Sequence, residues 1–193
     1  MTRIIAGRAG GTTLEVPGAG TRPTSDRVRE SLFGALESAE ALRGARVVDL
    51  YAGSGALGLE AVSRGAASAD LVERAGPAAT IVQRNAARVT KSTGRDVPIR
   101  VHRVAVTAYL GRAAGPFDLA FLDPPYDLSD DDLTADLAAL RPLLTEHAVV
   151  IVERGLRSPA PAWVDAGLEA LRDRTYGDTT LWWGQPRAES QSV

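Results

Sequence analysis

The sequence of 193 residues contains no cysteine, one lysine, two histidines and few aromatic residues, which make up 5% of the chain. Without cysteine, the protein has no disulfides, thiolate zinc sites, iron–sulfur clusters or cysteine nucleophiles. His102 and His147 stand apart without further ligand-like residues, so we expect no metal site. Because Lys91 is the only lysine, nearly all positive charge is carried by arginine, which suits phosphate recognition and base stacking.

Long apolar runs are also missing. No segment approaches the stretch of about 20 apolar residues that a membrane-spanning helix needs, and the first residues show no signal-peptide pattern. The content of 45% hydrophobic and 24% charged residues is typical of a globular protein. We therefore expect a cytoplasmic, monomeric protein without membrane contacts, of a length that suits one α/β domain.

The formal net charge of −2 argues against a large, uniformly positive surface for nucleic acid. Arginine nevertheless outnumbers acidic residues in the first 30 positions. Any contact with nucleic acid should therefore be local and use this amino-terminal arm. The candidate residues for such a contact are Arg3, Arg8, Arg22, Arg27 and Arg29.

Strand-like and helix-like patterns alternate along most of the chain. Two short β-like runs around Gly10 and Gly11 predict a hairpin and linker over residues 1–23, ahead of a main domain over residues 24–193. Capping residues at 24–26 open a helix that we expect to end near Gly44. Further strands are predicted at 47–51, 69–73, 97–104, 117–123 and 147–153, helices at 56–64, 77–91 and 128–140, and an antiparallel closing pair at 168–176 and 179–183. This order indicates an α/β fold with a mostly parallel sheet that binds its ligand at the carboxyl ends of the strands.

A glycine-rich loop joins the first strand of that domain to its helix. Gly53-x-Gly55-x-x-Gly58 allows a ligand to approach the backbone closely, and Glu73 ends the next strand, where an acid can hold a ribose hydroxyl. This spacing fits both NAD and S-adenosylmethionine. Asp49, upstream of the glycines, favours S-adenosylmethionine, because a carboxylate attracts its sulfonium and ammonium groups but gains nothing beside a pyrophosphate.

The tetrad Asp123-Pro124-Pro125-Tyr126 follows an apolar strand and is the most specific motif of the chain. An exocyclic amine of a base is a weak nucleophile that must become more tetrahedral before it attacks a methyl group. The Asp123 carboxylate and the Pro124 carbonyl can accept hydrogen bonds from its two N–H groups and so stabilise that change. Tyr126 can stack on an extruded base. Elsewhere in the chain, the same four residues would indicate only a turn.

These motifs resemble the class I, S-adenosylmethionine-dependent amino-methyltransferases. The stretch RPTSDRVRESLF at residues 22–33, together with RIIAG at residues 3–7, is similar to the RsmD family of 16S rRNA guanine-N2 methyltransferases, a resemblance that extends to about Glu153. It implies a Rossmann-like fold, methyl transfer to the N2 amine of a guanine in small-subunit rRNA, S-adenosylhomocysteine as product, and a wholly or partly assembled small ribosomal subunit as partner. The implied catalytic residues are Asp123, Pro124 and Tyr126, and the implied cofactor-binding residues are Thr24, Asp49, Tyr51, Gly53, Gly55, Glu73, Ala105 and Asp123.

The chain departs from the class at two positions. Gly34 stands where the family usually has asparagine, and Val104 where an acid often receives the adenine amino group. Three alternatives remain open from the sequence. The tetrad also occurs in adenine-N6 methyltransferases of DNA or RNA, an NAD-dependent oxidoreductase would need a proton-relay residue that we do not find, and a non-catalytic RNA-binding protein would not need the tetrad.

Overall fold

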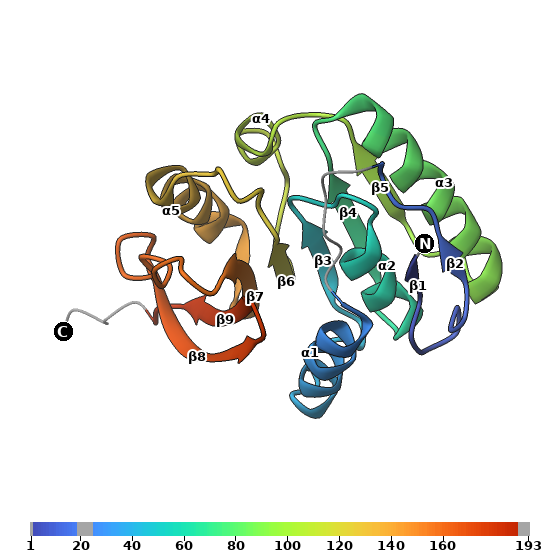
Figure 1. Cartoon of the computed structure of the whole chain (residues 1–193), viewed down its shortest axis with the longest axis horizontal. Helices are drawn as coiled ribbons and strands as arrows, with labels where there is room; N and C mark the ends of the chain where they lie inside the picture. Colours follow the sequence, from blue (N-terminus) through green and yellow to red (C-terminus); the bar gives the residue numbers. More distant parts are fainter. Residues whose placement is uncertain (1, 19–24, 189–193) are drawn as a thin grey trace.

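The computed structural model describes residues 2–18 and 25–188, and its centre is a seven-stranded sheet (Figure 1). The strand order is β5-β4-β3-β6-β7-β9-β8. The strands are β3 (Arg46–Asp49), β4 (Ser68–Val72), β5 (Ile99–His102), β6 (Phe117–Leu122), β7 (Leu144–Gly155), β8 (Leu168–Tyr176) and β9 (Thr179–Pro186). The first five strands of this order run parallel, and β9 lies antiparallel between β7 and β8. The predicted α/β fold with an antiparallel closing strand is therefore confirmed.

Helices cover both faces of the sheet. They are α1 (Asp26–Ser38), α2 (Ala56–Ser63), α3 (Gly76–Thr93), α4 (Val106–Leu110) and α5 (Asp130–Leu140), the last followed by a 3₁₀ turn at Arg141–Leu143. Alternate residues of β6 enter different cores: Phe121 packs with α1 to α3, and Leu122 packs with α4 and α5. A strand buried on both faces must be apolar along its whole length, which explains the continuous run at the end of β6.

The amino-terminal hairpin consists of two short strands, β1 (Thr2–Arg3) and β2 (Thr13–Leu14). Its residues Ile4, Ala9 and Leu14 are fully buried in the same core as α1, α2 and α3. The hairpin was predicted correctly, but it packs into the core of the main domain. The predicted boundary at residue 23 lies outside the described residues.

The structure differs from the sequence prediction at two helices. Helix α1 ends at Ser38 instead of near Gly44, because Glu40 takes a left-handed backbone conformation (φ 55°) and Leu42 then turns into the core. Helix α4 was not predicted, since five residues are too few for a 3.6-residue periodicity to be visible.

Candidate cofactor and catalytic site

A cavity of about 630 Å³ lies at the carboxyl ends of the parallel strands. The loops after β3, β4, β5 and β6 contribute to its wall, and so does the amino-terminal segment through Thr2, Val16 and Pro17. Six of the predicted cofactor residues line it: Asp49, Tyr51, Gly53, Glu73, Ala105 and Asp123. Thr24 lies outside the described residues. The position of the cavity is the one expected for the ligand site of an open parallel sheet.

Two glycines of the loop serve packing instead of lining the cavity. Gly55 precedes α2 in a left-handed conformation (φ 79°), and a side chain there would press on Leu59 and Val82. Gly55 is not among the residues that line the cavity, and its predicted role in cofactor binding stays a prediction. At Gly58 a Cβ atom would lie 2.3 Å from Leu71, so only glycine allows α2 to approach β4 this closely.

Glu73 is held at the rim of the cavity by backbone groups. Its Oε2 accepts a hydrogen bond of 3.1 Å from the Gly53 N–H, and its Oε1 accepts one of 2.7 Å from the Ala75 N–H. These contacts join the carboxylate to the glycine loop and orient it beside the cavity. A carboxylate in this place can accept hydrogen bonds from the hydroxyls of a ribose.

Asp49 is a buried carboxylate with one oxygen still available. Its Oδ2 accepts the Gly58 N–H at 3.1 Å, whereas Oδ1 is buried without a hydrogen-bond partner among the described residues. Burial raises the pKa of Asp49 to about 7; the Gly58 hydrogen bond opposes this shift and the nearby Glu73 charge adds to it. A cationic group in the cavity would stabilise the ionised form and satisfy Oδ1.

Tyr51 and Asp136 form a second buried polar contact at the cavity, in which the Tyr51 hydroxyl donates to the Asp136 carboxylate. Burial raises the pKa of Asp136, the Tyr51 hydrogen bond opposes that shift, and the Asp132 charge adds to it. The sequence analysis did not identify Asp136. Its spacing from Leu133, Leu137 and Leu140 on the buried face of α5 is the signal that could have done so.

The tetrad lies between the cavity and a second, much smaller recess of about 10 Å³. Asp123 lines both spaces; Pro125 lines the cavity, while Pro124 and Tyr126 line the recess together with Glu153. The Tyr126 side chain is 75% exposed and lies over Gly155. Asp123 therefore lies between the cavity and the part of the surface that carries the exposed Tyr126 ring.

Arg154, also not identified from the sequence, holds the loop that follows the tetrad. Its guanidinium is 7% exposed and donates to the Leu128 carbonyl at 3.2 Å and to Asp130 Oδ1 at 2.9 Å. Arginine can brace a loop in this way because its planar donors reach a carbonyl and a carboxylate together. The contact joins the start of α5 to β7.

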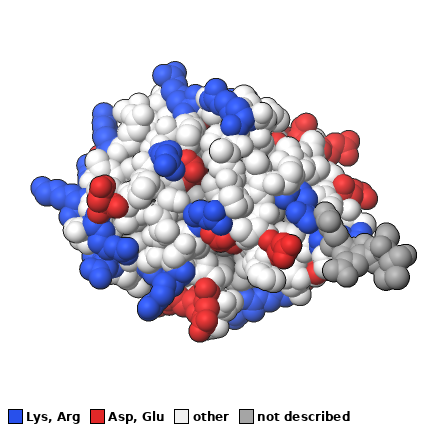
Figure 2. Space-filling view, turned by 180° about the vertical axis from the view of Figure 1, so that it is seen from behind, with Lys and Arg blue, Asp and Glu red and all other residues white. Residues whose placement is uncertain are grey.

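The predicted RNA-binding arginines are not all at the surface. Arg3, Arg8 and Arg27 are exposed, whereas Arg22 lies outside the described residues. The prediction for Arg29 is wrong, because its side chain is 1% exposed and its guanidinium pairs with Asp26. On the face shown in Figure 2, basic and acidic groups alternate and form no continuous positive patch. The part of the chain that the structure describes contains no helix long and apolar enough to cross a bilayer.

The fold and the cavity define a class I methyltransferase. The solved structure "Putative methyltransferase yhhF from Escherichia coli" superimposes with a TM-score of 0.78 at 32% identity, over 97% of this chain and 99% of that one. The methyltransferase domain and its Rossmann-like topology are thus shown by similarity as well as by geometry.

A family profile described as "Conserved hypothetical protein 95" matches residues 2–185, and the chain belongs to this family, the RsmD family. The chain is 34% identical to "Ribosomal RNA small subunit methyltransferase D" of Escherichia coli (strain K12) over 191 residues, 98% of this chain and 92% of the relative. It is 32% identical to the protein of the same name from Haemophilus influenzae over 177 residues, which are 91% and 89% of the two chains.

Proposed function

We propose that the protein transfers a methyl group from S-adenosylmethionine to the exocyclic N2 amine of a guanine in 16S rRNA, and releases S-adenosylhomocysteine. The observation that carries this proposal is the position of Asp123, which lines both the cavity and the recess beside Tyr126. A methyl donor in the cavity and a base at the recess would then share one carboxylate at their boundary.

The chemistry of the cavity fits S-adenosylmethionine. Asp49 offers a buried carboxylate oxygen to the ammonium of the methionine part, and Glu73 offers its carboxylate to the ribose hydroxyls. No acid follows β5, so the apolar Val104 and Val106 and the backbone around Ala105 would receive the adenine. An NAD pyrophosphate would instead bring negative charge close to Asp49, which the site disfavours.

The residues of the tetrad would act on the target amine. The Asp123 carboxylate and the Pro124 carbonyl accept hydrogen bonds from its two N–H groups, which favours the tetrahedral geometry needed for attack. The nitrogen lone pair forms the new N–C bond while the C–S bond of the sulfonium breaks and its electrons remain on sulfur. The proton that the amine loses leaves through Asp123 or through water. Tyr126 holds the base by stacking throughout.

Ribosomal RNA as the substrate is supported by the family. The relatives from Escherichia coli and Haemophilus influenzae are named as small-subunit rRNA methyltransferases and match nearly the whole chain. The exposed Arg3, Arg8 and Arg27 would contact phosphates, and Arg22 and Thr24 keep the roles predicted from the sequence. Because the face shown in Figure 2 has no continuous positive patch, we expect a partly or fully assembled subunit in the cytoplasm as the partner.

The deciding experiment is methyl incorporation from labelled S-adenosylmethionine into small ribosomal subunits from cells that lack the enzyme. We expect N2-methylguanosine in digested 16S rRNA, identified by mass and chromatography against synthetic standards. Detection of N6-methyladenosine instead would establish the adenine alternative. Calorimetric binding of NAD that is tighter than that of S-adenosylhomocysteine would support the oxidoreductase and contradict the proposal.

A further inference from the structure

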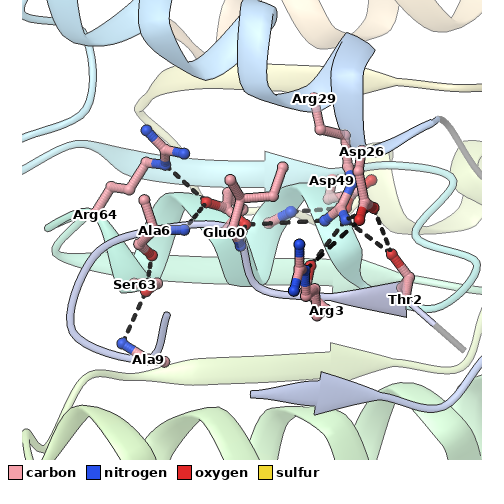
Figure 3. Close-up of polar contacts among 12 residues, drawn as sticks. Thr2, Arg3, Ala6, Ala9, Asp26, Arg29, Asp49, Glu60, Ser63 and Arg64 are labelled. Atoms are coloured by element: carbon pink, nitrogen blue, oxygen red, sulfur yellow. Dashed lines mark hydrogen bonds and ion pairs between the residues drawn. The ribbon is translucent and has the colours of Figure 1, made fainter. Parts of the chain in front are cut away.

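The amino-terminal segment, residues 2–17, is joined to α2 by a fully buried carboxylate (Figure 3). Glu60 of α2 accepts the Ile5 N–H at 2.7 Å through Oε2 and the Ala6 N–H at 3.0 Å through Oε1. The Arg64 guanidinium donates to the same Oε1 at 2.7 Å. A buried charge is stable only when it is paired and hydrogen-bonded, so this carboxylate depends on the docked segment.

Ser63, the last residue of α2, makes further contacts with the same segment. The Ser63 hydroxyl donates to the Ala6 carbonyl at 2.6 Å and accepts the Ala9 N–H at 2.9 Å. The Arg8 N–H donates to the Ser63 carbonyl at 2.8 Å. Gly7 has a left-handed conformation (φ 81°), and a Cβ atom there would lie 2.1 Å from the Ser63 carbonyl oxygen. The segment therefore rests on α2 without space for a side chain between them.

Arg29 of α1 binds the start of the segment from the other side, as Figure 3 shows. Its Nη2 donates to Thr2 Oγ1 and to the Arg3 carbonyl, both at 2.8 Å, and its Nη1 lies 3.8 Å from Glu60 Oε2. This network explains why Arg29 is buried instead of facing RNA. It places Thr2 at the wall of the cavity.

The far end of the segment is connected directly to the glycine loop. Asn85 of α3 is fully buried; it accepts the Glu15 N–H at 2.9 Å, and its amide donates to the carbonyls of Glu15 and Ser54, each at 2.9 Å. Ser54 belongs to the glycine loop and lines the cavity next to Val16 and Pro17. One amide side chain thus joins the wall formed by the segment to the loop that faces the ligand.

We propose that residues 2–17 form a wall of the cofactor site, that Glu60 and Asn85 are the positioning residues that hold it, and that cofactor binding and docking of the segment are coupled. The proposal rests on the cavity being the S-adenosylmethionine site of the proposed function. Coupling of this kind is reciprocal: loosening the wall weakens cofactor binding, and a bound cofactor stabilises the wall. The segment is then part of the cofactor site, and its exposed Arg3 and Arg8 would reach RNA from this docked position.

The test uses S-adenosylhomocysteine as the probe and calorimetry as the measurement. Glu60→Gln keeps the size of the side chain but turns an amide NH₂ toward a backbone N–H, and Asn85→Asp turns a carboxylate toward two carbonyl oxygens. We expect each variant to bind the probe about tenfold or more weakly, as the loss of a buried hydrogen-bond network predicts. The matched control is Glu37→Gln, because Glu37 also pairs with Arg64, at 3.1 Å, but is half exposed and does not contact the segment.

Hydrogen exchange on the unaltered protein gives a second measurement that does not depend on a variant folding. We expect the probe to slow exchange of the backbone amides of Ile5, Ala6 and Glu15 as well as those of the glycine loop. A purely structural role would lower the thermal stability of Glu60→Gln while leaving its affinity at low temperature unchanged, and that result would overturn the proposal. Protection confined to the glycine loop would overturn it too. If the unaltered protein does not bind the probe at all, the proposed function itself is wrong.

Discussion

The site has an inner side, next to the amino-terminal segment, and an outer side, next to Tyr126. The two sides differ in how exposed their residues are. On the inner side, the amino-terminal segment packs against α2 and α3 through residues such as Ile4, Glu60 and Asn85, none of which is exposed. On the outer side, Tyr126 is 75% exposed and the neighbouring Leu156 is 54% exposed. In the proposed function, the inner side is a preorganised cofactor site, and the outer side would be completed by the substrate base.

This difference has a consequence for the effects of substitutions. A change on the inner side should act on cofactor binding, because the contacts already exist in the free protein. A change on the outer side should act on the reaction and on the base, because its contacts form only with substrate. The following predictions test that division.

The largest effect is expected at the boundary between the two sides. Asp123→Ala should lower the single-turnover methylation rate by a factor of about 10² to 10³, the usual loss of one preorganised group in the transition state, and should leave the affinity for S-adenosylhomocysteine nearly unchanged. Asp127→Ala is the control, since Asp127 also lines the cavity but is exposed and lies beyond the tetrad. A near-native rate for Asp123→Ala would mean that the tetrad is only a turn.

On the inner side, Glu73→Ala should weaken binding of S-adenosylhomocysteine by about 1.5–3 kcal/mol, the typical contribution of a charge-assisted hydrogen bond. The reaction rate at saturating cofactor should change much less. Calorimetry and single-turnover kinetics on the same preparation separate the two quantities. An unaltered affinity would remove Glu73 from the ribose site.

On the outer side, Tyr126→Ala should weaken substrate binding and lower the rate together, since stacking on a base contributes about 1–3 kcal/mol. Tyr126→Phe should retain most of the activity, because the ring face makes the contact. Cofactor affinity should be native in both variants. If Tyr126→Ala and Tyr126→Phe lost the same amount of activity, the hydroxyl and not the ring would make the important contact.

The smallest effect concerns pH. Because burial raises the pKa of Asp49 to about 7, binding of the cationic ammonium must remove a proton below that pH. Affinity for S-adenosylhomocysteine should rise by about tenfold per unit as pH approaches 7 and then level off. Asp49→Asn should bind weakly with little pH dependence over the same range. If the affinity of Asp49→Asn for S-adenosylhomocysteine rose with pH as steeply as that of the unaltered protein, a group other than Asp49 would cause the pH dependence.

The same shift affects the stability of the free protein. The pKa of Asp49 is higher in the folded protein than its ordinary value of 3.8, so the protonated form stabilises the fold at low pH. This contribution is lost as pH rises through about 7, and the bound cofactor should restore it. Thermal melting at pH 5.5 and 7.5, with and without S-adenosylhomocysteine, measures the change.

Much of the architecture and of the site could be predicted because its signals are local in the sequence. The glycine loop, Glu73 and the tetrad each follow a strand, and parallel strands bring their carboxyl ends to one edge. That rule alone placed Asp49, Glu73 and Asp123 around a common cavity. The type of each long helix and strand was equally visible, since its periodicity is carried by neighbouring residues.

Only the tertiary structure decided which charged residues are buried and what they hold. Arg29 looks like a surface residue in the sequence, and nothing near Glu60 or Asn85 predicts a partner in the amino-terminal segment. The partners that Arg29, Glu60 and Asn85 find in the segment lie 26 or more positions away along the chain, as for Arg29 with Arg3 and Glu60 with Ile5. Burial of a charge depends on such distant partners, so local patterns could not show that the hairpin is a wall of the site.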